Sequence, residues 1–186
     1  MNLRRIVVIS LVVILSSVLG MILLKPACAA ENPLNSDNYF KTEFVYEAKI
    51  LLDRARILLG QSKYGGRNII WITGGTFKGP NIEGTVIPGG ADWQLVRPDG
   101  VTELDSRYTL KTNDGVIIYV NNRVLARPDP GGQDLASPGQ YRRCVLSFEA
   151  PLGSKYEWLN KFVYLGTLTP PTDTEAAVII RVWKLL

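Results

Sequence analysis

The amino-acid sequence predicts an all-β protein, a single antiparallel β-barrel of about eight or nine strands with little helix. Two observations lead to this fold class. From residue 42 onward, apolar and polar residues mostly alternate with a period of two, as they do in strands that bury one face. Clusters of Gly, Pro, Asn and Asp separate these segments at short intervals, and closing such strands into a barrel leaves no exposed edge.

The chain begins with a segment that is typical of exported proteins. A short cationic start precedes an almost wholly apolar run over residues 6–24, and residues 27–29 have the small-x-small pattern of a cleavage site. We therefore expect residues 1–29 to be a signal peptide and the protein to be periplasmic or secreted. The apolar run could also span a bilayer, in which case an uncleaved segment would anchor the protein to a membrane.

The composition of the remaining chain excludes several classes of function. The net charge of +4 falls to +1 without the three cations of the leader, so the sequence predicts no nucleic-acid partner. Histidine is absent from the sequence, and Cys144 is the one cysteine beyond the leader. This excludes Ser-His-Asp and Cys-His catalysis, histidine metal sites and an internal disulfide. Acidic residues show no metal-ligand spacing, and we expect neither a metal nor a cofactor.

The first part of the domain is predicted to contain two strands. Residues 30–41 are polar and are expected to be an arm that precedes the barrel domain, residues 42–186. Alternation predicts a first strand over 44–52, although residues 51–60 are also compatible with one or two helical turns. A loop is expected over 60–67, before a β-branched strand over 68–73.

Strong turn motifs divide the rest of the chain. KGPN, PGG, RPDG and NDG delimit strands near residues 82–87, 91–97, 101–112 and 115–122. The last two form the clearest hairpin, because Asn113 and Asp114 precede Gly115 at their junction. A Pro- and Gly-rich loop is expected over 127–139. After it the sequence predicts a strand over 141–149, a bend at YEWLNK, and two further strands over 162–168 and 176–184.

The strand over 101–112 carries the first candidate catalytic residues. Its alternation places Asp105 and Arg107 on a polar face, opposite Leu104 and Tyr108. This face could simply be solvated. Alternatively, Asp105 and Arg107 could point into the barrel, where Arg107 would stabilise an anion and Asp105 would hold it and serve as acid or base.

The strand over 115–122 is apolar on both faces. Tyr119 alternates with its apolar neighbours, so both sides of this strand need a cover, which predicts a homo-oligomer; a loop or helix over the barrel would also serve. Asn122 ends the strand and is a candidate ligand-binding residue, although it could equally satisfy its own turn.

Further candidates follow two glycines at residues 89 and 90. Asp92 and Gln94 share one face there, and Asp92 is either a turn-capping carboxylate or a site acid. Glu149 is a third catalytic candidate near a strand end, and Trp158 lies in an aromatic segment suited to a small-molecule cavity. An aromatic cluster of this kind also suits an ordinary barrel plug.

Four segments in this order resemble one known family: GGTFKGP, GTVIPGGADWQLVRPDG, LDSRYTLKTNDGVIIYVNNR and FEAPLGSKYEWLNK. They are similar to the small bacterial and fungal proteins grouped as domain of unknown function 3237, over roughly residues 42 to 185. The resemblance implies an antiparallel β-barrel and no established activity. We therefore expect a barrel that binds a small, partly hydrophobic molecule. The alternatives are an isomerase, cyclase or lyase that uses Asp, Glu, Tyr and Arg, and a non-catalytic structural envelope protein.

Overall fold

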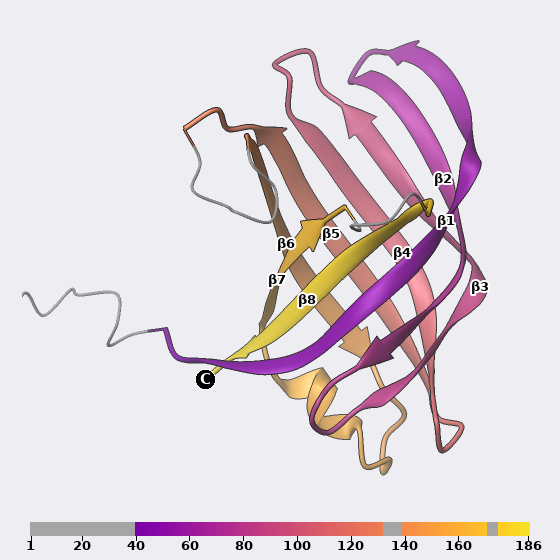
Figure 1. Ribbon diagram of the computed structural model, residues 1–186, viewed down its shortest axis with the longest axis vertical. Coiled ribbons are helices and arrows are strands. Elements are labelled where there is room, and N and C mark those ends of the chain that lie inside the picture. The colour runs from indigo at the N-terminus through magenta and orange to yellow at the C-terminus, as the bar shows by residue number, and fades with distance from the viewer. Residues whose placement is uncertain (1–39, 132–138, 171–174) are drawn as a thin grey trace, which may run out of the picture. The chain divides into compact units, whose positions relative to one another are not determined.

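The computed structural model, which describes residues 40–131, 139–170 and 175–186, is a closed barrel of eight antiparallel strands (Figure 1). Each strand pairs with the next along the chain, and β8 pairs with β1 to close the sheet. The strands are β1 (Thr42–Ser62), β2 (Gly65–Lys78), β3 (Glu83–Val96), β4 (Thr102–Thr112), β5 (Ile117–Pro128), β6 (Gln140–Glu149), β7 (Tyr164–Thr169) and β8 (Ala177–Leu185). The predicted fold class is confirmed.

The two ends of the barrel differ in what covers them. At one end, here called the helix end, the chain between β6 and β7 forms a short 3₁₀ helix, η2 (Glu157–Lys161), that lies across the barrel (Figure 1). Tyr156 and Leu159 of this segment are buried in the core. At the other end, the hairpin end, the chain turns between β1 and β2, between β3 and β4, and between β5 and β6.

An aromatic core fills the half of the barrel nearest the helix end. Tyr46, Phe77, Phe148 and Tyr164 meet edge to face, with ring centroids 4.7 to 6.1 Å apart. These side chains come from β1, β2, β6 and β7 at positions that face inward in the pleat. Because such rings bury large apolar areas, they supply much of the core that a disulfide-free domain needs.

The hairpin of β4 and β5 is confirmed, with Thr102 opposite Ala126 and Lys111 opposite Ile117. Three predictions upstream were wrong. The expected loop over 60–67 is only a two-residue turn, and the strand after it, β2, begins at Gly65 and continues to Lys78. The first strand does not stop near residue 52 or become helical, but continues to Ser62 and pairs with β2 as far as Gly65. Likewise, the segments 82–87 and 91–97 are one strand, β3, because the Pro-Gly-Gly segment forms a bulge in the ladder instead of a turn.

The signal peptide and most of the polar arm predicted before residue 42 lie outside the described residues. Among the residues that are described, no helix has the length and apolar character needed to cross a membrane.

Candidate functional site

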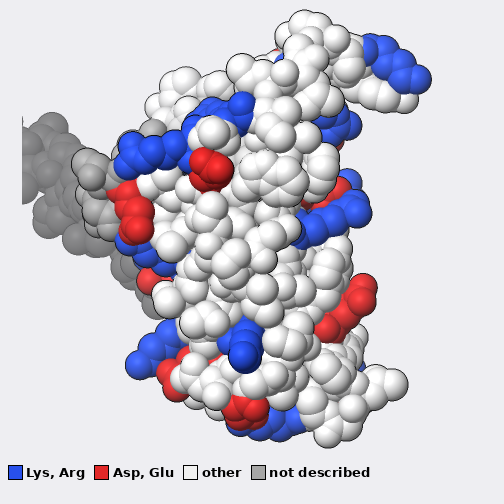
Figure 2. Space-filling model, turned by 90° about the vertical axis from the view of Figure 1, so that its right-hand side faces the viewer, with Lys and Arg blue, Asp and Glu red and all other residues white. Residues whose placement is uncertain are grey.

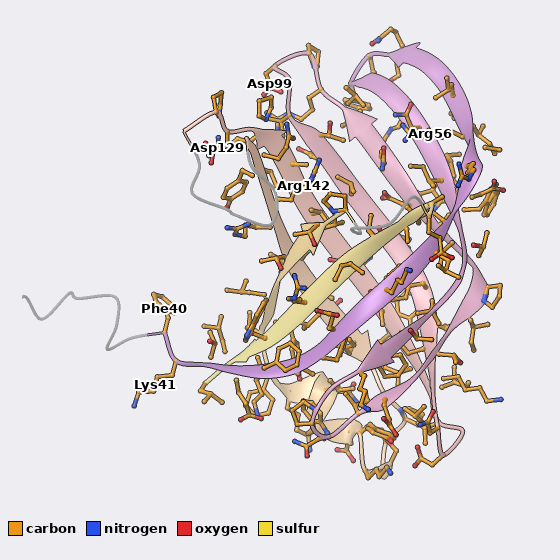
Figure 3. All side chains as sticks on the ribbon, viewed as in Figure 1. Phe40, Lys41, Arg56, Asp99, Asp129 and Arg142 are labelled. Carbon is orange, nitrogen blue, oxygen red and sulfur yellow. The ribbon has the colours of Figure 1, made fainter. Side chains whose placement is uncertain are left out.

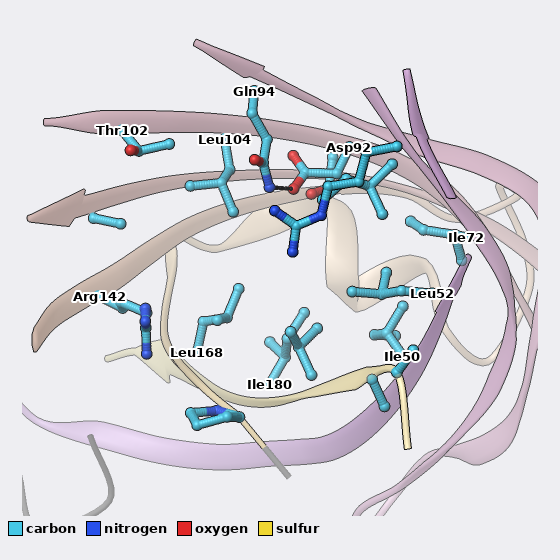
Figure 4. Close-up of a pocket in the computed structure, with 18 of the residues that line it drawn as sticks. Ile50, Leu52, Ile72, Asp92, Gln94, Thr102, Leu104, Arg142, Leu168 and Ile180 are labelled. Atoms are coloured by element: carbon cyan, nitrogen blue, oxygen red, sulfur yellow. Dashed lines mark hydrogen bonds between the residues drawn. The ribbon is translucent and has the colours of Figure 1, made fainter. Parts of the chain in front are cut away.

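A cavity of about 860 Å³ occupies the half of the barrel nearest the hairpin end (Figure 4). Its wall combines aliphatic with polar and charged side chains and comes from strands on opposite sides of the barrel. The apolar side chains that Figure 4 labels around it are Ile50, Leu52, Ile72, Leu104, Leu168 and Ile180. A cavity of this size and lining is typical of sites for small, partly apolar molecules.

Asp92 is the buried acid of this cavity. It lies on β3 opposite Ser106 of β4 and is 6% exposed. The bulge just before it brings the two strands unusually close: a Cβ on Gly90 would stand 2.6 Å from the Arg107 carbonyl oxygen and 2.7 Å from the Tyr108 Cβ. Only glycine permits this approach, which positions the end of β3 that carries Asp92.

Burial raises the pKa of Asp92 above its ordinary value, because a carboxylate loses its hydration in the barrel. Contacts with Gln94 and Ser106 lower it again in part. The Gln94 side-chain amide donates to Asp92 Oδ2 at 2.7 Å, whereas the buried Oδ1 has no partner of normal hydrogen-bond geometry within the described part of the chain (Figure 4). Asp92 is thus a carboxyl group whose neutral form is favoured, next to an apolar space.

Asn122 continues a polar row across the barrel. It lies on β5 directly opposite Ser106, and Ser106 lies opposite Asp92, so three adjacent strands present polar side chains inward at one level. Asn122 is fully buried, and neither its Oδ1 nor its Nδ2 has a partner of normal geometry among the described residues. Buried amides are usually hydrogen-bonded, so this row is an unusually polar layer beneath the cavity.

Three tyrosines contribute further polar groups to the interior. The hydroxyls of Tyr46, Tyr108 and Tyr164 are buried, and none has a partner of normal geometry among the residues that the structure describes; Tyr108 also lines the cavity. Burial raises the pKa of all three phenols, so they stay protonated and can donate hydrogen bonds.

The rim of the cavity at the hairpin end is rich in arginine. Arg54, Arg56, Arg127 and Arg142 all line it, and Figure 3 shows Arg56 and Arg142 on different sides of this end. Arg127 is held by Asp129, with 3.0 Å between Nη1 and Oδ1. Guanidinium groups at a cavity entrance favour ligands that carry a negative or strongly hydrogen-accepting group.

The structure places Asp105 and Arg107 on the outside of the barrel, so the hypothesis that they point into the lumen was wrong. Arg107 Nη2 lies 3.0 Å from Asp105 Oδ2, and the Asn121 amide donates to Asp105 Oδ1 at 3.1 Å. The Arg107 guanidinium holds the pKa of Asp105 below its ordinary value. An exposed pair of this kind is the solvated outer face that was the alternative.

The other predicted site residues divide between the two faces. Asp92 and Gln94 line the cavity and touch each other, and Asn122 lies in the polar row beneath it. Glu149 and Tyr119 lie opposite each other on β6 and β5 and face outward. Trp158 belongs to η2 at the helix end, where Lys184 Nζ lies 5.6 Å from its ring centroid.

Sequence reasoning missed several residues of the site. The arginines at the rim, the serine of the polar row and the tyrosines of the core were not selected. Ser106 and Tyr108 share the inward face of β4 with Leu104. If the face of Asp105 and Arg107 is assigned to solvent, the alternation of the strand places Ser106 and Tyr108 inside the barrel. Arg54 and Arg56 lay in a segment with no clear period. No three potential metal ligands gather among the residues that the structure describes.

Comparison with known proteins finds one family and several solved relatives. The family model described as Protein of unknown function (DUF3237) matches residues 40–185. A UPF0311 protein of Clostridium acetobutylicum is 36% identical over 131 residues, which are 66% of this chain and 82% of that protein. The crystal structure of a β-barrel-like protein from Acinetobacter baumannii superimposes with a TM-score of 0.70 at 32% identity, covering 79% of this chain and 96% of that chain.

One relative is named for a reaction. The hydroalkoxylation enzyme phnH of Penicillium herquei is 31% identical over 143 residues, which are 77% of this chain and 82% of that enzyme. The family resemblance found in the sequence is confirmed, and the chain belongs to the DUF3237 family.

Proposed function

We propose that this DUF3237 barrel binds a small, partly apolar molecule in its cavity and acts on it by proton transfer through Asp92. The observation that carries the proposal is the position of Asp92, a buried carboxyl group whose pKa is raised, in the wall of a partly aliphatic cavity of about 860 Å³. A buried acid of this kind is a candidate general acid and base.

The cavity lining supports binding of a molecule with both apolar and polar parts. Aliphatic side chains cover about half of the wall, and Asp92 and Gln94 offer neighbouring hydrogen-bonding groups on it. Such a lining fixes the orientation of a ligand through a few polar contacts while burial of its apolar surface supplies the affinity. The arginine-rich rim favours a ligand with an acidic or hydrogen-accepting substituent.

Asp92 can both supply a proton and take one back, which suits an addition to a double bond. The protonated carboxyl donates its proton to one carbon of a substrate C=C bond. A hydroxyl oxygen of the same substrate bonds to the other carbon, and the hydroxyl proton returns to the carboxylate. A C–H and a C–O bond replace an O–H bond and a π bond, so the step needs no cofactor and regenerates Asp92 in its starting form.

A reaction of this class agrees with the name of one relative. Hydroalkoxylation is the addition of an alcohol to an alkene, and the Penicillium herquei enzyme of that name covers 77% of this chain. We therefore propose that this protein is an isomerising or cyclising enzyme, so that its product is an isomer of its substrate.

The binding step is tested with 8-anilinonaphthalene-1-sulfonate, a fluorescent molecule with an apolar body and one anionic group. Leu104→Trp places a large ring in the cavity and is expected to weaken binding by about tenfold or more. Leu125→Trp is the matched control, because Leu125 lies on the outer face of the neighbouring strand and is 41% exposed. Equal affinity in all three proteins would mean that the dye does not use the cavity, and this outcome contradicts the proposal.

The chemical step is tested with a phenol that carries a neighbouring prenyl group, whose cyclisation is followed by chromatography. Asp92→Asn is expected to lower the rate by about 10² to 10⁴. Asp105→Asn, which changes the outward carboxylate, is expected to keep it. If the unaltered protein binds the dye but does not turn over the phenol, the result favours a carrier. If Asp105→Asn loses turnover, the outward carboxylate takes part in the reaction, which contradicts the role of Asp92.

A further inference from the structure

We propose that the tip of the β1–β2 hairpin, residues 54–67, docks on an anionic lipid bilayer. The tip is the part of β1 and β2 that extends beyond the pairing of β1 with β8, which ends at Leu51. It stands at the hairpin end of the barrel (Figure 1). This inference concerns a surface that adjoins the cavity at Arg54 and Arg56, and it does not depend on the proposed reaction.

Four large apolar side chains are exposed at the tip. Leu58 is 69% exposed, Leu59 61%, Tyr64 59% and Ile57 46%. Three of them are consecutive, whereas scattered single apolar residues are what a protein surface normally carries. We therefore expect a lipid or protein partner to cover this cluster when the protein functions.

The strand geometry favours a bilayer over another protein as the cover. Ile57 and Leu58 pair with Ile69 and Asn68, and successive residues of a strand point to opposite faces. The tip is thus apolar on both of its faces. A second copy or a globular partner laid against the tip would cover one face, whereas a lipid layer surrounds an inserted tip on both.

The charges of the tip match an anionic surface. Residues 54–67 contain Arg54, Arg56, Lys63 and Arg67 and no acidic residue. In Figure 2, the projecting end at the top of the molecule carries blue side chains beside a large uncharged surface. Lys63 Nζ lies 4.8 Å from the centroid of the Tyr64 ring, and a lysine beside an aromatic ring is a combination typical of the membrane–water boundary. Clustered cations next to exposed apolar residues are typical of surfaces that bind anionic lipids.

The backbone of the tip suits the hydrated boundary of a bilayer, because its β1–β2 ladder is paired whereas the other edge of β1 has no strand partner beyond Leu51. The ladder continues to the pair Ser62 and Gly65, and the turn is fixed because Ser62 Oγ donates to the Gly65 carbonyl oxygen at 2.8 Å and accepts from the Tyr64 amide. Paired backbone groups are what a lipid environment requires.

Docking at the tip would bring the cavity close to the lipid. Leu52, Asp53, Arg54 and Arg56 belong to the same strand and line the cavity. An apolar molecule dissolved in the bilayer could then pass to the rim without crossing bulk water, which is the advantage that the surface would give to a protein with a partly aliphatic cavity.

Vesicle co-sedimentation tests the proposal on residues 36–186, so that the apolar run at residues 6–24 makes no contribution. This part forms one compact unit, and it includes the residues that match the solved barrel of Acinetobacter baumannii, 96% of which is covered. The probe is a vesicle of phosphatidylglycerol and phosphatidylcholine in equal parts, with pure phosphatidylcholine for comparison. We expect binding to the anionic vesicles that weakens with added salt.

Two pairs of substitutions separate the apolar and the charged contributions. Leu58→Ser with Leu59→Ser is expected to lower the partition coefficient by about tenfold or more. Lys63→Gln with Arg67→Gln is expected to lower it by about fivefold for each charge removed. Leu152→Ser and Lys111→Gln are the matched controls, because Leu152 is 84% exposed and both residues lie toward the helix end; they should bind as the unaltered protein does.

Three results would overturn the proposal. The first is no binding of the unaltered protein to anionic vesicles, and the second is equal binding of the tip variants and the controls. The third is a change from dimer to monomer in sedimentation velocity when Leu58 and Leu59 are replaced, since a second copy would then be what covers the tip. Circular dichroism of each variant establishes that the barrel is intact.

Discussion

Asp92 and Asp105 lie on adjacent strands, and the face of the sheet alone decides their chemistry. Asp92 faces inward, and burial raises its pKa; Asp105 faces outward, and Arg107 lowers its pKa. The two carboxyl groups therefore shift in opposite directions from the same ordinary value. Only the inward one is poised to hold a proton near an apolar ligand.

This contrast predicts opposite pH dependences of stability. A raised folded-state pKa means that the folded protein binds the Asp92 proton more tightly than the unfolded chain does. The stabilisation is therefore complete below the ordinary pKa of Asp and is lost as the pH rises through the folded-state pKa. Relative to Asp92→Asn, the unaltered protein should be most stable in acid and lose this advantage toward neutral pH, as measured by urea denaturation across a pH series.

Asp105→Asn provides the control of opposite sign. Because the folded-state pKa of Asp105 is lowered, its contribution is present above the ordinary pKa and is lost as the pH falls through the folded-state value. A difference between the unaltered protein and Asp92→Asn that does not change with pH would contradict the burial that we assign to Asp92.

At the scale of the elements, the long β1–β2 hairpin depends on close backbone contact. Gly75 of β2 has a φ of +140°, and a Cβ there would stand 2.1 Å from the Lys49 carbonyl oxygen of β1. Gly60 has a φ of +79° but open space around it. The first glycine is needed for both conformation and packing, and the second for conformation alone.

Substituting these two glycines separates the two causes. Gly60→Ala is expected to lower the free energy of unfolding by about 1 kcal/mol, which is the cost of the backbone conformation. Gly75→Ala should cost about 3 kcal/mol or more, because the strands must also move apart. Equal losses in thermal or urea denaturation would show that the contact between β1 and β2 is not tight.

The elements also show why some boundaries were predictable. The turn at Asn113, Asp114 and Gly115 has a sequence that hardly any other local structure prefers, so the β4–β5 hairpin was predicted within a few residues. The Pro-Gly-Gly segment at residue 88 has equally strong turn residues, yet β3 continues through it because the residues on either side of it pair with both neighbouring strands. Local sequence cannot distinguish a bulge from a turn when the partner strands decide.

At the scale of the whole molecule, the homo-oligomer stays a prediction, and the outer surface of the barrel offers a candidate contact for it. Val145 of β6 is 55% exposed and pairs with Leu165 of β7, which is 40% exposed, and Leu125 of β5 is 41% exposed. Val145 and Leu165 begin an apolar band that continues across the ladders to Trp183 of β8 and Phe44 of β1 and is distinct from the hairpin tip. Arg123 and Arg143 separate this band from Leu125.

Val145→Lys tests this band. If a second copy covers it, the substitution should convert the oligomer to a monomer, because an unpaired charge would be buried in the interface. Sedimentation velocity measures the change, and Lys111→Gln, an exposed change on β4, is the control. A monomeric unaltered protein would contradict the prediction.

The sequence by itself determined the all-β class, the family and the absence of histidine chemistry, because these depend on periodicity, motifs and composition that need no knowledge of contacts. It also placed Asp92 and Gln94 on one face, since a strand alternates strictly. Only the tertiary structure decided which face of each strand is inside. That choice moved Asp105 and Arg107 to solvent and brought Asp92, Ser106 and Asn122 into one row, because barrel closure aligns residues from separate strands by their register.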